Sequence, residues 1–552
     1  MTKLIIKNGL VYDPLNKIKG EVKDILVEDG KIVEDFSSEG EVKEIDASDK
    51  TVIPAALDIH THAASQQTNW ARLLGTENKL FQKVWNGLTL ESIARNYISN
   101  GYTFILESNV YPSLARQTTF NFEHLPVLDK GMLLNASNLW ALESEFERDK
   151  IEEMAAFISD LLRLSKGFGI KVYNPFEAES WNFNILRNQL DKDGRLYSFS
   201  PLAVYENLTR AAEKLQLPHS IHAHIEGYET ETAKKNVRDV LEKVKSIESE
   251  LSQENGLNRT QIFHLAHANA YNIDGDNSYL IDLLNSNGKI DLDVGMVSFN
   301  EINPLITSDR HLIDQFTKSS DYKVIRNGVE SEGDSFATLR QLKKSNKRHC
   351  TLWANALELA LKVENKWQVQ LSFNFPNYSD VSNIPTISTW LVSKKARKAF
   401  IDEMNEDIAG DMSIASLDDE LSFNEFIILT RASPAKSLGL AGIKGGFTPG
   451  ADGDINILNM NIDEVDLSND FDQLEASLQN IEYVIKNGKV VKHGDKIDLN
   501  ENGRIFWADG HVDAQVKERI IPKKKEFYQK YYSMFYDRLE CHLKDDELRK
   551  VE

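Results

Sequence analysis

The residues best suited to chemistry in this sequence are histidines at the ends of apolar segments. His60 and His62 follow the apolar run VIPAALD and are separated by one residue. Residues two apart on a β-strand face the same side, so both imidazoles can bind one metal ion at about 2.0–2.1 Å. A surface pair would have the same spacing, but the end of an apolar strand favours metal ligands.

Two further histidine groups follow apolar runs. One contains His219, His222 and His224, and the other contains His264 and His267. Taken singly, each group is better explained by core or surface histidines than by ligands. Three groups on predicted barrel strands change this balance, because active sites of α/β barrels lie at the C-terminal strand ends and histidine is the commonest metal ligand.

Lys171 lies inside the apolar segment GIKVY. A buried lysine is costly unless it is paired or modified. One interpretation is an ion pair with a nearby carboxylate. The other is a lysine carbamylated by CO₂, which becomes an anionic oxygen ligand and bridges two metal ions.

The elements that position these residues alternate between short strands and helices from about residue 56 to 430. This alternation predicts βαβ units around a parallel sheet, and seven or eight such strands predict a barrel. The strand candidates are Ala56–His62, Tyr102–Glu107, Gly169–Tyr173, Ser220–His224, Gln261–Ala268, Ile290–Val297 and Val369–Phe373. The helix candidates are residues 88–101, 150–167, 201–216, 236–252 and 393–407.

Both ends of the chain have a different pattern. Short alternating strands with hairpin turns at Asn8-Gly9 and Asp29-Gly30 fill the first fifty residues, and similar strands with Asn487-Gly488 return near the end. We therefore predict two halves of a small β-sandwich (1–55 and 431–505), a barrel (56–430) and a C-terminal helical extension (506–552).

The extension carries four apolar residues at i, i+4 spacing, which predicts one helix. This helix either packs on its own barrel or contacts a partner subunit. The four residues are Phe527, Tyr531, Phe535 and Leu539.

Composition excludes several classes of protein. The 552 residues carry a net charge of −21, which argues against nucleic acid or an anionic membrane as a partner. The two cysteines, Cys350 and Cys541, cannot supply a disulfide framework, an iron–sulfur cluster or a cysteine zinc site. With no signal peptide and no apolar run of about 18 residues, we expect a cytoplasmic protein without a membrane span.

With these features the chain resembles the amidohydrolase superfamily. Within it, the chain resembles the A subunits of formylmethanofuran dehydrogenase and of the bacterial formyltransferase/hydrolase complex. The stretches that carry the resemblance are DIHTHAASQQTNWAR, GIKVYNPFEAESW, LPHSIHAHIEGYETE, HLAHANAYNIDG, DVGMVSFN and LWANALELAL. The resemblance covers almost the whole chain and implies a (β/α)₈ barrel with a β-sandwich built from both chain ends.

The resemblance also implies two divalent metal ions at the barrel mouth, which are zinc in that family. His60 and His62 would bind the first ion, carbamylated Lys171 would bridge both, and His224 and His267 would bind the second. The nitrogen and oxygen ligands suit zinc, although Fe, Mn, Co or Ni also fit.

Two of these assignments have close alternatives. His222 lies two residues from His224, and His264 lies three residues from His267. His224 is preferred because it closes its strand, and His267 because HLAH-A resembles the superfamily's usual pattern on strand six.

The last ligand of the family is an aspartate in a motif of the form Thr-Thr-Asp-His-Pro-Asn-Gly. The matching stretch here is SFNFPNY, which places Asn374 at the aspartate position. Asparagine offers a carbonyl oxygen but cannot act as a base near pH 7. Asp293, Asp380 or Glu177 could take over the proton role.

The resemblance implies a metal-dependent amidohydrolase subunit that interconverts N-formylmethanofuran with formate and methanofuran, beside other subunits of a complex. Two alternatives stay open. The chain could hydrolyse another amide, such as the cyclic ureides of hydantoinases and dihydroorotases, or it could be a structural subunit impaired by Asn374.

Overall fold

The structure is a computed structural model of the chain. It describes residues 2–73, 86–175, 199–248, 259–299, 301–307, 309, 312, 325–327, 335–410 and 412–552.

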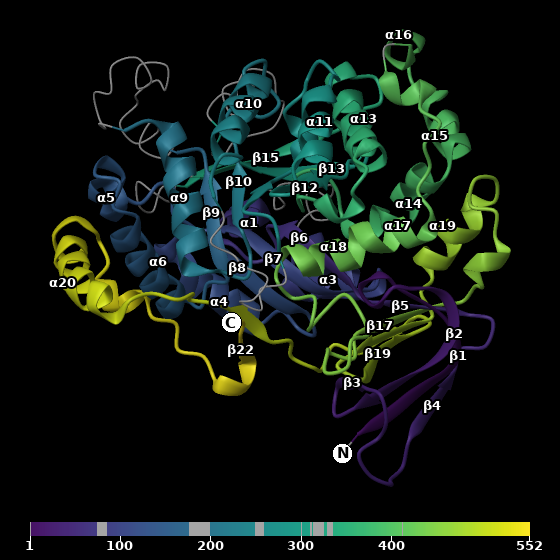
Figure 1. Ribbon diagram of the computed structural model, residues 1–552. Helices are drawn as coiled ribbons and strands as arrows, with labels where there is room; N and C mark the ends of the chain where they lie inside the picture. The colour runs from purple at the N-terminus through teal and green to yellow at the C-terminus, as the bar shows by residue number, and fades with distance from the viewer. Residues whose placement is uncertain are drawn as a thin grey trace.

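Eight parallel strands form a nearly closed barrel at the centre of the molecule (Figure 1). Neighbouring strands pair in parallel from β6 round to β16. Between β16 and β6 the barrel closes through a parallel bridge of Thr61 and Phe375, beside which the His62 N–H donates to the Phe375 carbonyl at 2.7 Å. The predicted barrel is therefore confirmed. Its strands are β6 (Ala56–Thr61), β7 (Tyr102–Val110), β8 (Asp129–Asn135), β9 (Gly169–Tyr173), β10 (Ile221–His224), β11 (Phe263–Leu265), β12 (Ile290–Gly295) and β16 (Val369–Ser372).

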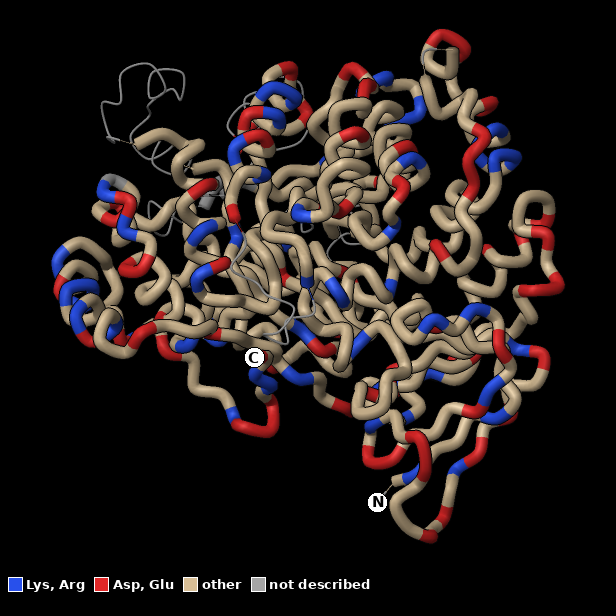
Figure 2. Tube along the Cα trace, in the orientation of Figure 1, with Lys and Arg blue, Asp and Glu red and all other residues tan. Residues whose placement is uncertain are grey.

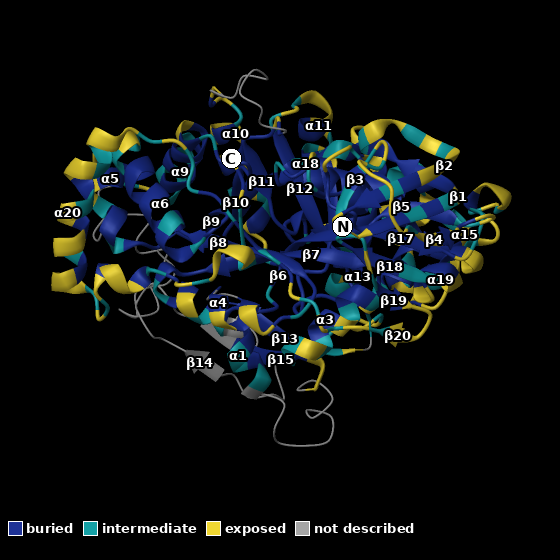
Figure 3. Cartoon of the chain, turned by 90° about the horizontal axis from the view of Figure 1, so that it is seen from below, coloured by how far each residue is buried: buried dark blue, intermediate teal, exposed yellow. Residues whose placement is uncertain are grey.

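Helices surround the barrel, so that its strands are buried and the exposed residues lie on the helices and loops (Figure 3). The Thr89 and Ser200 side chains cap two of the helices, and Pro201 follows in the first turn of the second. Such caps bond N–H groups that a helix start leaves unpaired. Each predicted helical segment contains or overlaps a helix. Among the helices around the barrel are α3 (Leu90–Ser99), α6 (Ile151–Ser165), α9 (Pro201–Leu215), α10 (Ala233–Val244), α11 (Ser278–Ser286), α13 (Lys347–Lys362) and α15 (Lys394–Ile401).

Strands from both chain ends form one nine-stranded sheet beside the barrel (Figure 1). The two ends meet where β5 (Thr51–Pro54) pairs antiparallel with β17 (Ile455–Leu458). As predicted, the small β domain is therefore built from both termini. Its other strands are β1 (Lys3–Asp13), β2 (Ile18–Glu28), β3 (Lys31–Val33), β4 (Lys43–Asp46), β18 (Tyr483–Lys486), β19 (Lys489–His493) and β20 (Lys496–Ile497).

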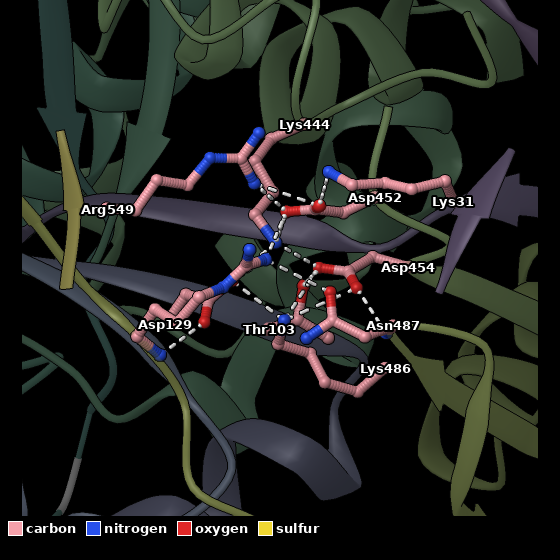
Figure 4. A network of polar contacts seen from close by, with 10 residues as sticks. Lys31, Thr103, Asp129, Lys444, Asp452, Asp454, Lys486, Asn487 and Arg549 are labelled. Atoms are coloured by element: carbon pink, nitrogen blue, oxygen red, sulfur yellow. Dashed lines mark hydrogen bonds and ion pairs between the residues drawn. The ribbon is translucent and has the colours of Figure 1, made fainter. Parts of the chain in front are cut away.

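A buried network of charges joins this sheet to the first residues of the barrel strands (Figure 4). The Lys444 ammonium lies 2.5 Å from Asp129, 2.8 Å from Asp452 and 2.6 Å from Asp454, and Lys486 lies 2.7 Å from Asp129. Asp129 begins β8 and Lys486 ends β18, whereas Lys444, Asp452 and Asp454 lie in the loop that leads into β17. Because a buried charge that loses its partner is strongly destabilising, the network holds the two units together.

The C-terminal extension forms a helix that ends earlier than the aromatic spacing predicts. Helix α20 (Ala514–Tyr531) packs on α6, and it carries consecutive lysines on an otherwise acidic chain (Figure 2). The backbone becomes extended at Tyr532, whose ring stacks on Tyr528 at 3.9 Å. Beyond it lie a short 3₁₀ helix (Tyr536–Leu539) and β22 (Leu548–Lys550), which pairs with β21 (Ile505–Trp507), so Phe535 and Leu539 lie outside α20.

An inserted three-stranded antiparallel sheet lies at the mouth of the barrel. It contains β13 (Ile302–Thr307), β14 (Ile325–Asn327) and β15 (Ser335–Gln341). In the described part of the chain, no helix combines the length and the apolar character that crossing a membrane requires.

Candidate metal centre

The two histidines of the first group lie at the C-terminal end of β6. His60 is inside the strand and is 1% exposed, and His62 follows its last residue. Each ring has a carboxylate near its Nδ1 atom, at 3.4 Å from Asp293 for His60 and at 3.4 Å from Glu107 for His62. A carboxylate at one ring nitrogen fixes the ring and leaves the other nitrogen for a metal ion.

Glu107 is a supporting residue that the sequence analysis did not identify. It lies on β7, and its Oε2 atom accepts hydrogen bonds from the N–H groups of Ala64 and Ser65 at 2.8 and 3.0 Å. These bonds hold the carboxylate beside His62. The signal was a glutamate in the apolar strand YTFIL-E, directly across from the histidine strand.

Lys171 lies in the middle of β9 and is 1% exposed. Its Nζ atom is buried without a hydrogen-bond partner among the described residues. Burial lowers the pKa of this lysine to about 7, against a small opposing effect of Asp293. A neutral amine is the form that reacts with CO₂, so the environment of Lys171 fits a carbamylated lysine.

His224 and His267 lie in contact with each other in the wall of the cavity. The Nδ1 atom of His224, the last residue of β10, lies 2.7 Å from the Nε2 atom of His267. His267 follows β11 in a left-handed conformation with φ 34° and ψ 57°, and it lines the cavity. The two nitrogens form a hydrogen bond with each other, and a metal ion bound by both rings would take the place of that bond.

Asn374 lies just beyond β16, also in a left-handed conformation with φ 43°. Its side chain is 3% exposed, and its Oδ1 atom accepts a hydrogen bond from Asn377 Nδ2 at 3.1 Å. The amide faces the same cavity as the histidines but cannot take up a proton at neutral pH. A carbonyl ligand or a hydrogen bond is what this position can offer.

The three carboxylates proposed as substitute bases have different surroundings or lie outside the described residues. Asp380 caps a short turn by accepting from the Ser382 N–H at 2.8 Å, and it also bonds Asn96. Glu177 lies outside the described residues. Asp293 contacts His60 from below the cavity, where it is fully buried.

The alternate histidines lie one layer deeper than the preferred ones. His222 Nε2 lies 3.0 Å from His60 Nδ1, and His264 lies between two carboxylates, 2.9 Å from Asp291 and 3.0 Å from Asp293. Although burial opposes the charge, these aspartates raise the pKa of His264 to about 9, so it is a cation at neutral pH. A protonated imidazole is not a metal ligand.

One set of ligand atoms in this deeper layer has a spacing that a metal ion could use. The nearest ring or carboxylate atoms of His60, His222 and Asp293 all lie within 4.8 Å of one another. The chain thus offers an outer set of ligands around the cavity and an inner set beneath it, and His60 belongs to both.

The cavity is closed from above by the inserted sheet. Asn377 accepts from the Ile306 N–H of β13 at 2.6 Å, and Arg340 of β15 donates to Glu229 at 3.0 and 3.1 Å and to the Asn377 carbonyl at 3.0 Å. These bonds fix the sheet over the strand ends. The cavity is lined by His60, His62, Asn109, Lys171, Tyr173, His224, Tyr228, His267, Ile306, Thr307, Asn374 and Asn377.

Comparison with known proteins gives one group of relatives along the whole chain. The amidohydrolase family profile matches residues 351–492. Protein FwdA of Methanocaldococcus jannaschii is 30% identical over 549 residues, which cover 96% of this chain and 95% of the relative. The A subunit of the formyltransferase/hydrolase complex Fhc of Methylorubrum extorquens is 25% identical over 540 residues, with 93% and 92% covered.

A solved structure has the same fold over its full length. The crystal structure of the formyltransferase/hydrolase complex FhcABCD from Methylorubrum extorquens, in complex with methylofuran, contains a chain that matches with a TM-score of 0.85. The match covers 100% of this chain and 99% of that chain, at 22% identity.

Proposed function

The chain belongs to the amidohydrolase family that contains FwdA and the corresponding protein of the Fhc complex, and on that premise we propose that it hydrolyses an N-formyl amine within a multi-subunit complex. The proposed reaction interconverts N-formylmethanofuran with formate and methanofuran. The complex would act in one-carbon metabolism in the cytoplasm, with a small-molecule substrate and no nucleic acid or membrane as a partner.

The observation that carries the proposal is the convergence of side chains suited to metal binding from four different barrel strands on one cavity. The proposed ligands are His60 and His62 for a first ion, Lys171 between the two ions, and His224 and His267 for a second. The unpaired Lys171 amine and the carboxylates behind His60 and His62 support this set. Zinc suits these donors, and a bound ion of this kind supplies activated water at neutral pH.

The side chains around the cavity would hold the formamide and keep bulk water away. The Asn109 and Asn374 amides line the cavity and can hydrogen-bond the formyl oxygen or the amide N–H. Tyr173 and Tyr228 both reach Thr307 on the covering strand β13, at 3.3 and 3.2 Å. These three side chains form a polar rim above the strand ends, which would contact the formamide group of the substrate.

Proton transfer is the step for which the cavity is least equipped. None of the described residues that line it is a carboxylate, and Asn374 cannot serve as a base. Because the loss of one general base costs about 10²–10⁴ in rate, we expect slow formate release from the isolated chain. The same feature favours the second candidate function, that of a metal-binding subunit without turnover of its own.

The test measures metal content per chain and formate release from an N-formyl amine in the same preparation. Wild type is compared with His224→Ala, and with His124→Ala as a control for removing an exposed histidine. We expect two metal ions and measurable formate release in wild type and in the control, and loss of the second ion and of formate release in His224→Ala. Release of product only from a cyclic ureide would identify another amidohydrolase, and two bound ions without turnover would identify the structural subunit.

Partners are tested separately by affinity purification from the source cells. We expect a formyltransferase subunit or a redox subunit to copurify, because one relative is named as a subunit of a formyltransferase/hydrolase complex. Purification of the chain alone from cells that express those subunits would contradict the proposal.

A further inference from the structure

Three imidazoles lie in series behind the cavity. His219 Nε2 lies 3.1 Å from His222 Nδ1, and His222 Nε2 lies 3.0 Å from His60 Nδ1. The series begins at the main chain, where His219 Nδ1 lies 2.8 Å from the Ser437 carbonyl oxygen. All three rings are at most 1% exposed, so water does not compete for these contacts.

The carbonyl oxygen at the start gives this series a direction. A carbonyl only accepts, so His219 Nδ1 must carry the hydrogen that bonds Ser437. A neutral imidazole has one N–H, so His219 Nε2 must then accept from His222 Nδ1. By the same rule His222 Nε2 must accept from His60 Nδ1, which leaves the lone pair of His60 on Nε2.

The ring nitrogens of His219 and His222 have their hydrogen-bond partners within this series. Among the described residues, the buried polar atoms without a partner include His224 Nε2 and His267 Nδ1, but no ring nitrogen of His219 or His222. In the part of the chain that the structure describes, neither ring has a carboxylate within hydrogen-bond distance, and the nearest contact is 3.9 Å from His222 to Asp293. Burial without a hydrogen-bonded carboxylate favours the neutral imidazole that the direction requires.

We propose that His219 and His222 are positioning residues that fix His60 in the tautomer with hydrogen on Nδ1, so that its Nε2 lone pair is presented to the cavity. Asp293 supports the same tautomer, because its Oδ2 atom lies 3.4 Å from His60 Nδ1. The inference rests on the proposed function in one respect, namely that His60 is a ligand of the first metal ion.

A rival arrangement uses the same atoms and predicts the opposite tautomer. His60 Nδ1, His222 Nε2 and Asp293 Oδ2 are separated by 3.0, 3.4 and 3.9 Å. Ligands of a tetrahedral zinc ion at about 2.0 Å would be about 3.3 Å apart, so an ion could lie among these three atoms. His60 would then lose the hydrogen on Nδ1 and carry it on Nε2.

The first experiment determines the tautomer of His60 directly. ¹⁵N-histidine-labelled protein is examined by long-range ¹H–¹⁵N NMR, first without metal and then with zinc bound, and the His60 signal is identified by its loss in His60→Gln. We expect a single Nδ1–H tautomer for His60 in wild type. An Nε2–H tautomer would overturn the proposal, and it would do so without any variant that might fail to fold.

A pair of variants at His219 tests whether the series causes this tautomer. His219→Gln keeps an acceptor near the position of Nε2, whereas His219→Met removes it. We expect His60 to remain the Nδ1–H tautomer in His219→Gln and to become a mixture of tautomers in His219→Met. A His60 signal that still reports a single Nδ1–H tautomer in His219→Met would overturn the proposal.

Metal affinity provides a second readout that does not depend on turnover. Zinc is titrated into each protein in competition with a chelator. We expect His219→Met to weaken one of two sites by about 10–100-fold and to leave the other unchanged, with His219→Gln close to wild type. Loss of a third bound ion in His222→Met would instead identify the rival inner site.

The tautomer of His60 and the release of formate are measured independently, so the failure of this inference can be distinguished from the failure of the proposed function. An Nδ1–H tautomer with bound zinc but no formate release would leave this inference standing and refute the hydrolase. An Nε2–H tautomer in a protein that releases formate would refute the inference alone.

Discussion

Lys171 offers the sharpest test of the metal centre, because its reactivity follows from its burial. Lys171 is a buried residue of β9, and burial lowers the pKa of its side chain from 10.5 to about 7. At pH 7 about half of the Lys171 side chains are then neutral amines, compared with about 0.03% for a lysine of ordinary pKa. The amine that reacts with CO₂ is therefore more abundant by about 10³-fold.

The perturbation is removal and return of bicarbonate, in wild type and in Lys171→Met. After metal and bicarbonate have been stripped, the protein is incubated with ¹³C-bicarbonate and zinc, and carbamate is counted by ¹³C NMR. We expect one carbamate per wild-type chain and none in Lys171→Met, with zinc uptake following the carbamate.

The pH dependence has a definite sign. The neutral fraction of Lys171 falls as pH falls through its pKa of about 7, to about one tenth at pH 6, and rises to about nine tenths at pH 8. Carbamate formation and zinc uptake should therefore increase from pH 6 to pH 8. A rate that is flat over this interval would show that the lysine is not titrating there.

Lys366→Met is the matched control. Lys366 is also buried, but its ammonium donates to the carbonyls of Ala360, Leu361 and Val363 at 3.0, 2.8 and 2.8 Å. All its hydrogens are used, so it has no place for a carbamate, and the control should keep the full signal. A wild-type signal that is absent, or one that survives in Lys171→Met, would refute the reasoning.

Three further predictions concern other parts of the chain. Asn374→Asp should raise kcat for formate release by about 10² at unchanged metal content, because it restores a base, and an unchanged kcat would mean that the proton is handled elsewhere. Glu107→Gln should weaken zinc binding at His62 by about 10–100-fold in chelator competition, since the amide no longer fixes the ring. Lys444→Met should lower the free energy of unfolding by about 3 kcal/mol in denaturant titrations, because it leaves buried carboxylates unpaired. Lys489→Met breaks an exposed pair and should change it by less than about 1 kcal/mol.

The fold was predictable because its signals are local. Strands that alternate with helices along the chain must form a parallel sheet, and the His60-His62 spacing carries the strand period directly. The spacing could not separate His222 from His224, because residues two apart on a strand share a face. The two differ in depth along the barrel, which depends on how far β10 extends towards the mouth.

The role of Glu107 and the end of helix α20 are two features that the sequence did not predict. The role of Glu107 depends on the pairing of β6 with β7, which brings its carboxylate beside His62. The contact between the two strands leaves no periodic trace in the sequence near Glu107. The aromatic spacing predicted a helix that continues too far, because it does not register the extended backbone at Tyr532, where α20 ends.

The pairing of β5 with β17 also constrains the order in which the chain can fold during synthesis. β5 ends at Pro54 and its partner begins at Ile455, about 400 residues later. At about 5–20 residues per second, β5 leaves the ribosome about 20–80 s before β17 exists. Throughout that interval the N-terminal strands present an open sheet edge, which is a template for pairing with other chains. We therefore expect the nascent chain to depend on a chaperone, and production of soluble protein to fall when synthesis outpaces it.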